Sequence, residues 1–247
     1  MAYRQQDLRS SRRGNNELKD KSGTENGVAF LGDFMKYSYC IWDFNGTILD
    51  DVELGIYAIN KLFEAHNMEK RLEREEYCAK FDFPIKDYYR RVGFDFEKTP
   101  YEELAVEWVD IYFSNFNKSK IFDDVVTTLE FFKKNGVSQS VLSASERNSL
   151  IEQITDFGIK DYFDEIMGIE NIYAASKLEL AKKWRREHPD EKVIFIGDTT
   201  HDIETAKILE ADCFIVCAGH QSRERFDGCD VTIVDSLTEL CELLKEA

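Results

Sequence analysis

The sequence predicts an α/β protein, in which a parallel sheet is flanked by helices and a small helical segment is inserted after the first strand. Short apolar runs such as Tyr39–Trp42 and Val193–Gly197 alternate with amphipathic helical stretches. Such alternation implies right-handed crossovers and a parallel sheet that is covered on both faces. Between the first run and the next comes a long stretch, 52–119, in which apolar residues recur at helical spacing.

Residues 1–35 are rich in Arg, Ser, Asn, Gly and Lys and show no sustained periodicity, which is typical of a flexible leader. Met35 directly precedes the first strand, so one hypothesis is that translation starts there; N-terminal sequencing of the native protein would test it. We expect residues 36–51 and 120–247 to form the α/β core, and residues 52–119 to form a helical cap.

The predicted elements follow one another without repeats. Within the insert, Pro84 and Pro100 mark breaks between helical patterns. The recurring apolar positions are Leu54, Ala58, Leu62 and Ala65 in the first pattern and Leu104, Trp108, Ile111 and Tyr112 in the second. Beyond the insert we expect helices over 125–134, 148–157, 177–187 and 202–209, and strands over 139–143, 165–168, 193–197, 213–217 and 231–234.

Composition limits the function. A chain of 247 residues with 43% apolar content can bury one sizeable core and a smaller unit. The net charge is −16, and because the first 35 residues carry six basic and five acidic residues, the remainder carries −17. That sign disfavours nucleic acid as a partner and favours a small metabolite screened by a metal. No apolar run is long enough to span a membrane and no signal peptide is present, so we expect a soluble cytoplasmic protein; the oligomeric state stays open.

The six cysteines contain no Cys-x-x-Cys pair, and a chain of this size does not need disulfides, so we expect free thiols in apolar positions. A zinc cluster of Cys213, Cys217 and His220 is an alternative. The first two, however, are separated by Phe-Ile-Val, which has strand composition and places both sulfurs on one face, as in an ordinary core.

The first strand runs directly into Asp43-Phe44-Asn45-Gly46-Thr47. An aspartate at the end of a buried strand can act as a nucleophile. Gly46 lets backbone N–H groups approach an anion, and Thr47 adds a hydroxyl donor. The segment therefore predicts a phosphoryl-transfer site, and ligands of a parallel sheet bind at this edge.

Three further sets of candidate site residues lie near strand ends or open a helix: Ser143 with Ala144, Lys177, and Asp198 with Asp202. With Asp43 they follow the order and spacing of a known family over roughly residues 38–245. The chain resembles the haloacid dehalogenase superfamily, closest to its phosphoglycolate phosphatase-like branch, whose core is a Rossmann-like parallel sheet with a helical cap between the nucleophile and serine motifs. One residue departs from the pattern: the second aspartate of the family's Asp-x-Asp-Gly-Thr motif is Asn45 here.

The resemblance implies a role for each matching residue. Asp43 is the expected nucleophile, and Thr47, Ser143 and Ala144 are expected to bind the phosphoryl group. Lys177 is expected to neutralise both the nucleophile and the phosphoryl oxygens. Asp43, Asp198 and the backbone carbonyl of Asn45 are expected to hold Mg²⁺, supported by Asp202; Mg²⁺ prefers such hard oxygen ligands.

The cap of such enzymes closes over the site and contacts the leaving group. Candidates within it are Lys86, Tyr88, Arg90 and Arg91, although adjacent arginines point to different sides of a helix and a solvated face is the simpler interpretation. His201 and His220 are further candidates, and either can also be structural.

Asn45 changes the expected chemistry. The family aspartate protonates the leaving oxygen and then deprotonates water, which an amide cannot do; a positioned acid/base contributes typically about 10²- to 10⁴-fold. The first hypothesis is a Mg²⁺-dependent phosphohydrolase that acts on a small phosphorylated metabolite through an aspartyl-phosphate. Its substrate would have a good leaving group, as in an acyl phosphate, or His201 or His220 would serve as the acid. The second is a phosphonate-type hydrolase with a Schiff base at Lys80 or Lys86. The third is a phospho-ligand-binding module with little turnover.

Overall fold

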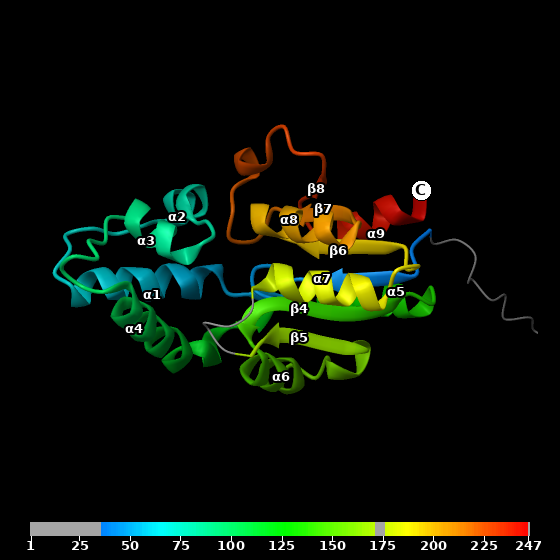
Figure 1. The fold of residues 1–247 in the computed structure, drawn as a ribbon, viewed down its shortest axis with the longest axis horizontal. Helices are drawn as coiled ribbons and strands as arrows, with labels where there is room; N and C mark the ends of the chain where they lie inside the picture. Colours follow the sequence, from blue (N-terminus) through cyan, green and yellow to red (C-terminus); the bar gives the residue numbers. More distant parts are fainter. Residues whose placement is uncertain (1–35, 171–175, 247) are drawn as a thin grey trace, which may run out of the picture. The chain divides into compact units, whose positions relative to one another are not determined.

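The computed structural model describes residues 36–170 and 176–246, so the predicted leader and the proposed start at Met35 lie outside the described residues. Its central element is a six-stranded parallel sheet (Figure 1). The strand order is β5-β4-β1-β6-β7-β8. The bounds are β1 Tyr39–Trp42, β4 Ser138–Glu146, β5 Glu165–Ile169, β6 Val193–Gly197, β7 Asp212–Val216 and β8 Thr232–Val234. The predicted fold class is confirmed.

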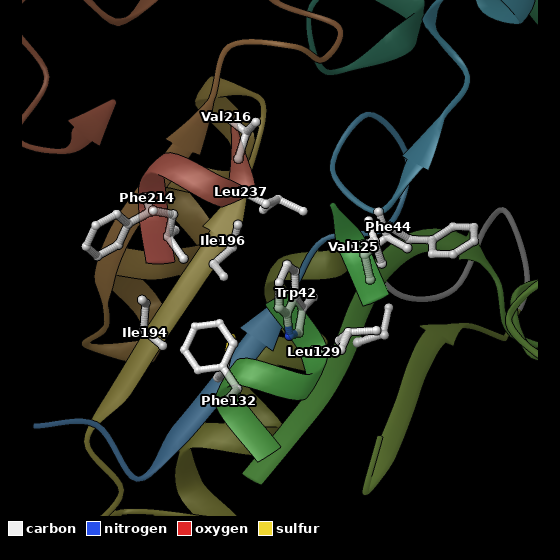
Figure 2. Packing of buried hydrophobic residues seen from close by; sticks show 14 of the residues in the cluster. Trp42, Phe44, Val125, Leu129, Phe132, Ile194, Ile196, Phe214, Val216 and Leu237 are labelled. Carbon is white, nitrogen blue, oxygen red and sulfur yellow. The ribbon is translucent and has the colours of Figure 1, made fainter. Parts of the chain in front are cut away.

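Helices cover both faces of this sheet because successive strand residues point to opposite sides. Trp42 of β1 and Ile196 of β6 pack with helices α5, α6 and α9 in one apolar cluster, part of which Figure 2 shows. Ile41 and Phe195, their sequence neighbours, pack with α7 and α8 on the opposite face. The helices run over Val125–Lys134 (α5), Arg147–Asp156 (α6), Lys177–Glu187 (α7), Thr200–Leu209 (α8) and Leu237–Glu246 (α9).

The helical insert, residues 52–119, has an apolar cluster of its own. Ile59 and Phe63 of α1 are fully buried there with Leu104 of α4. Pro84 and Pro100, the two predicted breaks, each directly precede a helix. The helices are α1 (Val52–Ala65), α2 (Arg74–Lys80), α3 (Ile85–Arg91) and α4 (Tyr101–Ser114), and Figure 1 shows them grouped together.

Two short strands connect the insert to the rest of the chain. β2 (Leu49–Asp50) pairs antiparallel with β3 (Lys120–Ile121), so the chain enters and leaves the insert at neighbouring points. Single-turn 3₁₀ helices lie at Phe116–Lys118 (η1), Lys160–Tyr162 (η2) and Arg223–Phe226 (η3). None of the helices in the described ranges has the length and apolar character that a membrane crossing requires.

Several predicted bounds are shifted by one or two residues, and three differences from the sequence-based expectation are larger. Helix α9 was not predicted, although Leu237, Leu240, Cys241 and Leu244 line one face of it. Strand β4 continues to Glu146 instead of ending at residue 143, and its pairing with β5 is irregular between Leu142 and Glu146. β2 and β3 have two residues each, too few to show a period.

The strand order fixes where a site can form. β1 lies between β4 and β6, and it is parallel to both. The chain passes from β1 to β4 on one side and later crosses to β6 on the other, which creates a crevice beyond the carboxyl ends of these strands. Asp43, Ser143 and Asp198 come from these three neighbouring strands or the residues just after them.

Candidate active site

Asp43 is held at the end of the central strand. Its backbone N–H donates to the carbonyl of Ile196 at 2.8 Å, which continues the β1–β6 ladder by one residue. Its side chain is about 10% exposed and contacts the Lys177 ammonium. A carboxylate at this position is therefore buried, fixed in direction and paired with a cation.

Asp43, Asp198 and Asp202 form a cluster of carboxylates. Each offers an oxygen that lies within 4.8 Å of the others'. Lys177, whose side chain is 3% exposed, bridges Asp43 and Asp202. One ammonium thus faces three buried carboxylates, which leaves negative charge uncompensated.

The pKa values of the three carboxyl groups reflect this excess of negative charge. Burial raises the pKa of Asp43 to about 7, although the charge of Lys177 opposes the rise. Burial also raises the pKa of Asp198 well above its ordinary value, against the opposing charge of His220. At Asp202 the effect of burial is outweighed by the charge and hydrogen bond of Lys177, which hold its pKa below the usual value.

These carboxylates fit a divalent cation. Three buried oxygen donors with a surplus of negative charge are the ligand set that Mg²⁺ accepts. Asp202 is already engaged, since its Oδ2 accepts hydrogen bonds from the backbone N–H groups of Asp198 and Thr199 and from the Thr199 hydroxyl. It therefore fits a supporting position, and Asp43 and Asp198 fit direct ligation. Cys213 and Cys217 are in no metal-ligand group among residues 36–170 and 176–246.

Glycines allow the backbone to approach Asp198 closely. A Cβ at Gly46, whose φ is +73°, would lie 2.1 Å from an Asp198 oxygen, and one at Gly219 would lie 2.2 Å from the same oxygen. Between them the His220 N–H donates to Asp198 Oδ2 at 2.6 Å. The turn after β1 and the turn after β7 thus enclose this carboxylate, and Gly46 is required both for its positive φ and for space.

Asn45 has three hydrogen bonds that fix the orientation of its amide. Nδ2 donates to Asp51 Oδ2 at 2.9 Å and to the Tyr112 hydroxyl at 3.3 Å. Oδ1 accepts from the Ser145 hydroxyl at 2.8 Å. The position therefore uses both a donor and an acceptor, which is what an asparagine supplies and an ionised aspartate does not.

Asp51 and His220 form a buried ion pair beside Asn45. His220 Nε2 lies 3.1 Å from Asp51 Oδ1, and the Tyr77 hydroxyl lies 3.0 Å from Nδ1. Asp51 also accepts from the Gly46 N–H and the Tyr112 hydroxyl. Burial alone would lower the pKa of His220, but the Asp51 carboxylate raises it to about 9. Sequence reasoning named His220 but missed Asp51, Tyr112 and Ser145.

Not all of the predicted phosphate-binding residues line a common cavity. Ser143 and Ala144 line a cavity in front of the carboxylates, as does Lys177. The Ser143 hydroxyl oxygen accepts the Ser145 N–H at 3.1 Å, so its own proton is available to a ligand. Thr47 is not among the lining residues; its hydroxyl donates to Asp198 at 3.5 Å.

The cavity has a volume of about 410 Å³, and side chains of the helical insert form part of its wall. Tyr88, His201 and His220 line it, but Lys86, Arg90 and Arg91 do not. These three are half-exposed or exposed, and each pairs with an acidic residue of the insert: Glu102, Asp87 and Asp82 respectively.

Comparison with known proteins agrees with this architecture. The family model described as haloacid dehalogenase-like hydrolase matches residues 40–216, well over half of the chain. A curated protein of Caldanaerobacter subterraneus subsp. tengcongensis, a candidate pyrophosphatase called PpaX, is 25% identical over 182 residues, which are 70% of this chain and 78% of that protein.

Solved structures share the fold. Protein Tyrosine Kinase A of Mycobacterium tuberculosis superposes with a TM-score of 0.71 at 20% identity, covering 84% of this chain and 98% of that one. A candidate phosphoglycolate phosphatase of Lactobacillus delbrueckii subsp. bulgaricus gives 0.68 at 20% identity, covering 85% and 99%. With the family match, the resemblance predicted from the motifs is confirmed: the chain belongs to the haloacid dehalogenase-like hydrolase family.

Proposed function

We propose that the protein is a magnesium-dependent phosphatase that moves the phosphoryl group of a small phosphorylated metabolite first to Asp43 and then to water. The observation that carries the proposal is one arrangement: a buried carboxylate at the end of the central strand, paired with Lys177 and within 4.8 Å of two more carboxylates. The candidate pyrophosphatase and phosphoglycolate phosphatase among the similar proteins support the same reaction class.

Each residue has a task in this reaction. Asp43 Oδ attacks phosphorus, and the bond between phosphorus and the leaving oxygen breaks. Lys177 reduces the repulsion between the carboxylate and the phosphate, which at about 4 Å costs several kcal/mol at an effective dielectric constant near 20. The Ser143 hydroxyl donates to a phosphoryl oxygen. A bound Mg²⁺ would stabilise the negative charge that moves onto the phosphoryl oxygens.

Asn45 gives no proton to the leaving group. It positions the active-site turn instead, through its bonds to Asp51 and Ser145. Without a general acid, turnover of ordinary alkyl esters should be slower by roughly 10²- to 10⁴-fold.

The two alternatives have less support. A phosphonate-type hydrolase needs a lysine that reaches the substrate, but neither Lys80 nor Lys86 lines the cavity, and each pairs with a glutamate. A binding module without turnover would keep the same cavity, so only a measurement of turnover separates it from a phosphatase.

The test measures phosphate release from a panel of phosphate esters, with Mg²⁺ and with a chelator, by wild type and Asp43→Asn. We expect release that needs Mg²⁺ and is abolished in Asp43→Asn, and we expect phosphorylated Asp43 in acid-quenched wild type by peptide mass spectrometry. Binding of a phosphate ester without any release would favour the binding module instead.

A further inference from the structure

The cavity wall opposite the carboxylates is aromatic. The helices of the insert and the segments beside them supply it, and no charged side chain of residues 52–119 lines the cavity. The aromatic lining residues of the insert are Tyr77, Phe81, Phe83, Tyr88, Tyr89, Trp108, Tyr112 and Phe113. Phe81 stacks on His220 with ring centroids 4.9 Å apart, so the aromatic surface reaches the site turn after β7. A ligand part that fills this side of the cavity meets ring faces and edges.

Positive charge on this side of the cavity is absent among the described residues. Of the described lining residues, those that can carry positive charge are Lys177, His201 and His220. Lys177 faces Asp43 and Asp202, His220 faces Asp51, and His201 Nδ1 lies 3.2 Å from Glu204. The lysine and the two arginines of α3 each pair with an acidic residue that does not line the cavity. A leaving group with its own carboxylate or phosphate would therefore be desolvated here without a cation to bind it.

Among the described residues beside Asp43, neither Asn45 nor its neighbours Asp51 and His220 are free to give the leaving oxygen a proton. The Asn45 amide cannot give a proton, and both Asp51 oxygens accept hydrogen bonds from neighbouring donors. Both ring nitrogens of His220 are engaged, with Asp51 and with Tyr77. The favoured leaving group is consequently one that departs as a stable anion. A phenol, whose pKa is near 10, meets this requirement far better than an alcohol, whose pKa is close to the value of about 16 for water.

Tyr88 adds a polar group to this wall. The residue lines the cavity and is 2% exposed, yet its hydroxyl has no hydrogen-bond partner among residues 36–170 and 176–246. A buried hydroxyl without a partner costs free energy, and a ligand can supply the missing partner. The Tyr88 hydroxyl is therefore suited to hydrogen-bond a polar substituent on the bound ring.

We propose that the substrate is a small aryl phosphate monoester, whose phosphate lies at Asp43 and whose aromatic ring occupies the aromatic side of the cavity. This inference rests on the proposed phosphatase function. Asp43 Oδ forms a bond to phosphorus while the phosphorus–oxygen bond to the ring breaks, and the electron pair leaves on the phenolate oxygen. The phenolate takes its proton from solvent after release, and water then hydrolyses the aspartyl-phosphate to inorganic phosphate.

The test compares kcat/KM for phenyl phosphate and a series of 4-substituted phenyl phosphates with propyl phosphate, 2-phosphoglycolate and pyrophosphate, all with Mg²⁺. We expect phenyl phosphate to exceed propyl phosphate by about 10²-fold or more, the usual contribution of a general acid. We expect it also to exceed 2-phosphoglycolate and pyrophosphate, because the second anionic group of each would be desolvated without a free cation among the described lining residues. Within the aryl series kcat/KM should rise steeply as the leaving phenol becomes more acidic.

Two variants on helix α4 test whether the aromatic wall of the cavity binds the ring of the substrate. Phe113 lines the cavity but is 45% exposed, so Phe113→Ala should fold; Val106 on the same helix is 55% exposed and does not line it. We expect Phe113→Ala to raise KM for phenyl phosphate about three- to tenfold, while inhibition by inorganic phosphate is unchanged. Val106→Ala should match wild type. Tyr88→Phe, which keeps the ring, should lower kcat/KM more for 4-hydroxyphenyl phosphate than for phenyl phosphate.

The outcomes separate this inference from the proposed function. If 2-phosphoglycolate or pyrophosphate matches phenyl phosphate and Asp43→Asn abolishes the activity, the function stands and the aryl preference is wrong. If kcat/KM depends only weakly on the acidity of the phenol, a donor such as His201 protonates the leaving oxygen. That result would also overturn the aryl preference. If no ester is hydrolysed in an Asp43-dependent manner, both proposals fail.

Discussion

The Asn45 amide matches its hydrogen-bonding surroundings, so the residue has a structural role although it cannot act as an acid. Its amide donates to the Asp51 carboxylate and accepts from Ser145, so the donor and the acceptor are both in use. An aspartate at this position would place a second carboxylate about where the amide nitrogen now lies, 2.9 Å from Asp51 Oδ2. Restoring the superfamily residue would therefore introduce repulsion between a partly buried carboxylate at position 45 and the buried carboxylate of Asp51.

We expect Asn45→Asp to lower the free energy of unfolding by about 2–4 kcal/mol, because it replaces a partly buried hydrogen bond with two facing carboxylates. Urea unfolding at pH 7 in the presence of a chelator measures it. The control is Asn117→Asp, which adds the same charge at an exposed position of η1, where a change within about ±0.5 kcal/mol is expected. Equal stability of the two variants would mean that Asp51 does not oppose a charge at position 45.

The site residues that the sequence identified share one property: they follow strands or open helices, where a local pattern reveals them. Asp43 and Asp198 come directly after the buried strands β1 and β6, and Lys177 begins α7. Asp51, Tyr112 and Ser145 were missed because their importance depends on contacts over long separations. Tyr112 is 61 residues from Asp51, and Ser145 is 100 residues from Asn45. No local pattern contains such a pairing.

At the scale of elements, strong patterns gave accurate bounds. Helices α5 and α7 and strand β6 begin and end at the predicted residues, because each has a regular apolar face and a clear boundary. For α7 that boundary is the Ser176 hydroxyl, which accepts the Glu179 N–H. The β2–β3 pair could not be predicted, since it is defined by backbone pairing between residues about 70 positions apart. The division of the chain into core and cap domains stays a prediction.

The contribution of the insert's apolar cluster to stability can be tested on helix α4. Leu104 of α4 is fully buried in the cluster with Ile59 and Phe63, whereas Val106 on the same helix is 55% exposed. We expect Leu104→Ala to cost about 2–5 kcal/mol of unfolding free energy and Val106→Ala less than about 0.5 kcal/mol. Urea unfolding followed by circular dichroism measures both. Similar small effects would show that the insert contributes little to the cooperative unit.

At the scale of the whole molecule, the metal site should contribute to stability. Saturating Mg²⁺ at about 100 times its dissociation constant adds about 2.7 kcal/mol, and a domain of this size gains roughly 2–4 °C in Tm per kcal/mol. We therefore expect an increase in Tm of about 5–10 °C on adding Mg²⁺ at constant ionic strength. Asp198→Asn should abolish it, whereas Asp190→Asn, at an exposed position, should retain it. An unchanged shift in Asp198→Asn would place the ion elsewhere.

The net charge of the protein should affect how fast an anionic substrate reaches the site. The chain carries −16, and residues 36–247 carry −17. The described lining residues do not reverse this sign, because five carboxylates face one lysine and two histidines. A phosphate dianion therefore approaches a repulsive field. Salt screens that field, with a Debye length of about 30 Å at 0.01 M and 8 Å at 0.15 M ionic strength.

We accordingly expect kcat/KM for a phosphate ester to rise about two- to fivefold as NaCl increases from 10 to 150 mM at fixed saturating Mg²⁺, because screening weakens the long-range repulsion. Inhibition by phenol, an uncharged product of the proposed reaction, provides the control, since its binding should not change with salt. Steady-state kinetics with KCl in place of NaCl separates screening from a specific ion effect. If kcat/KM instead fell with salt, the bound metal and Lys177 would dominate the field at the cavity mouth, and the net charge would not control encounter.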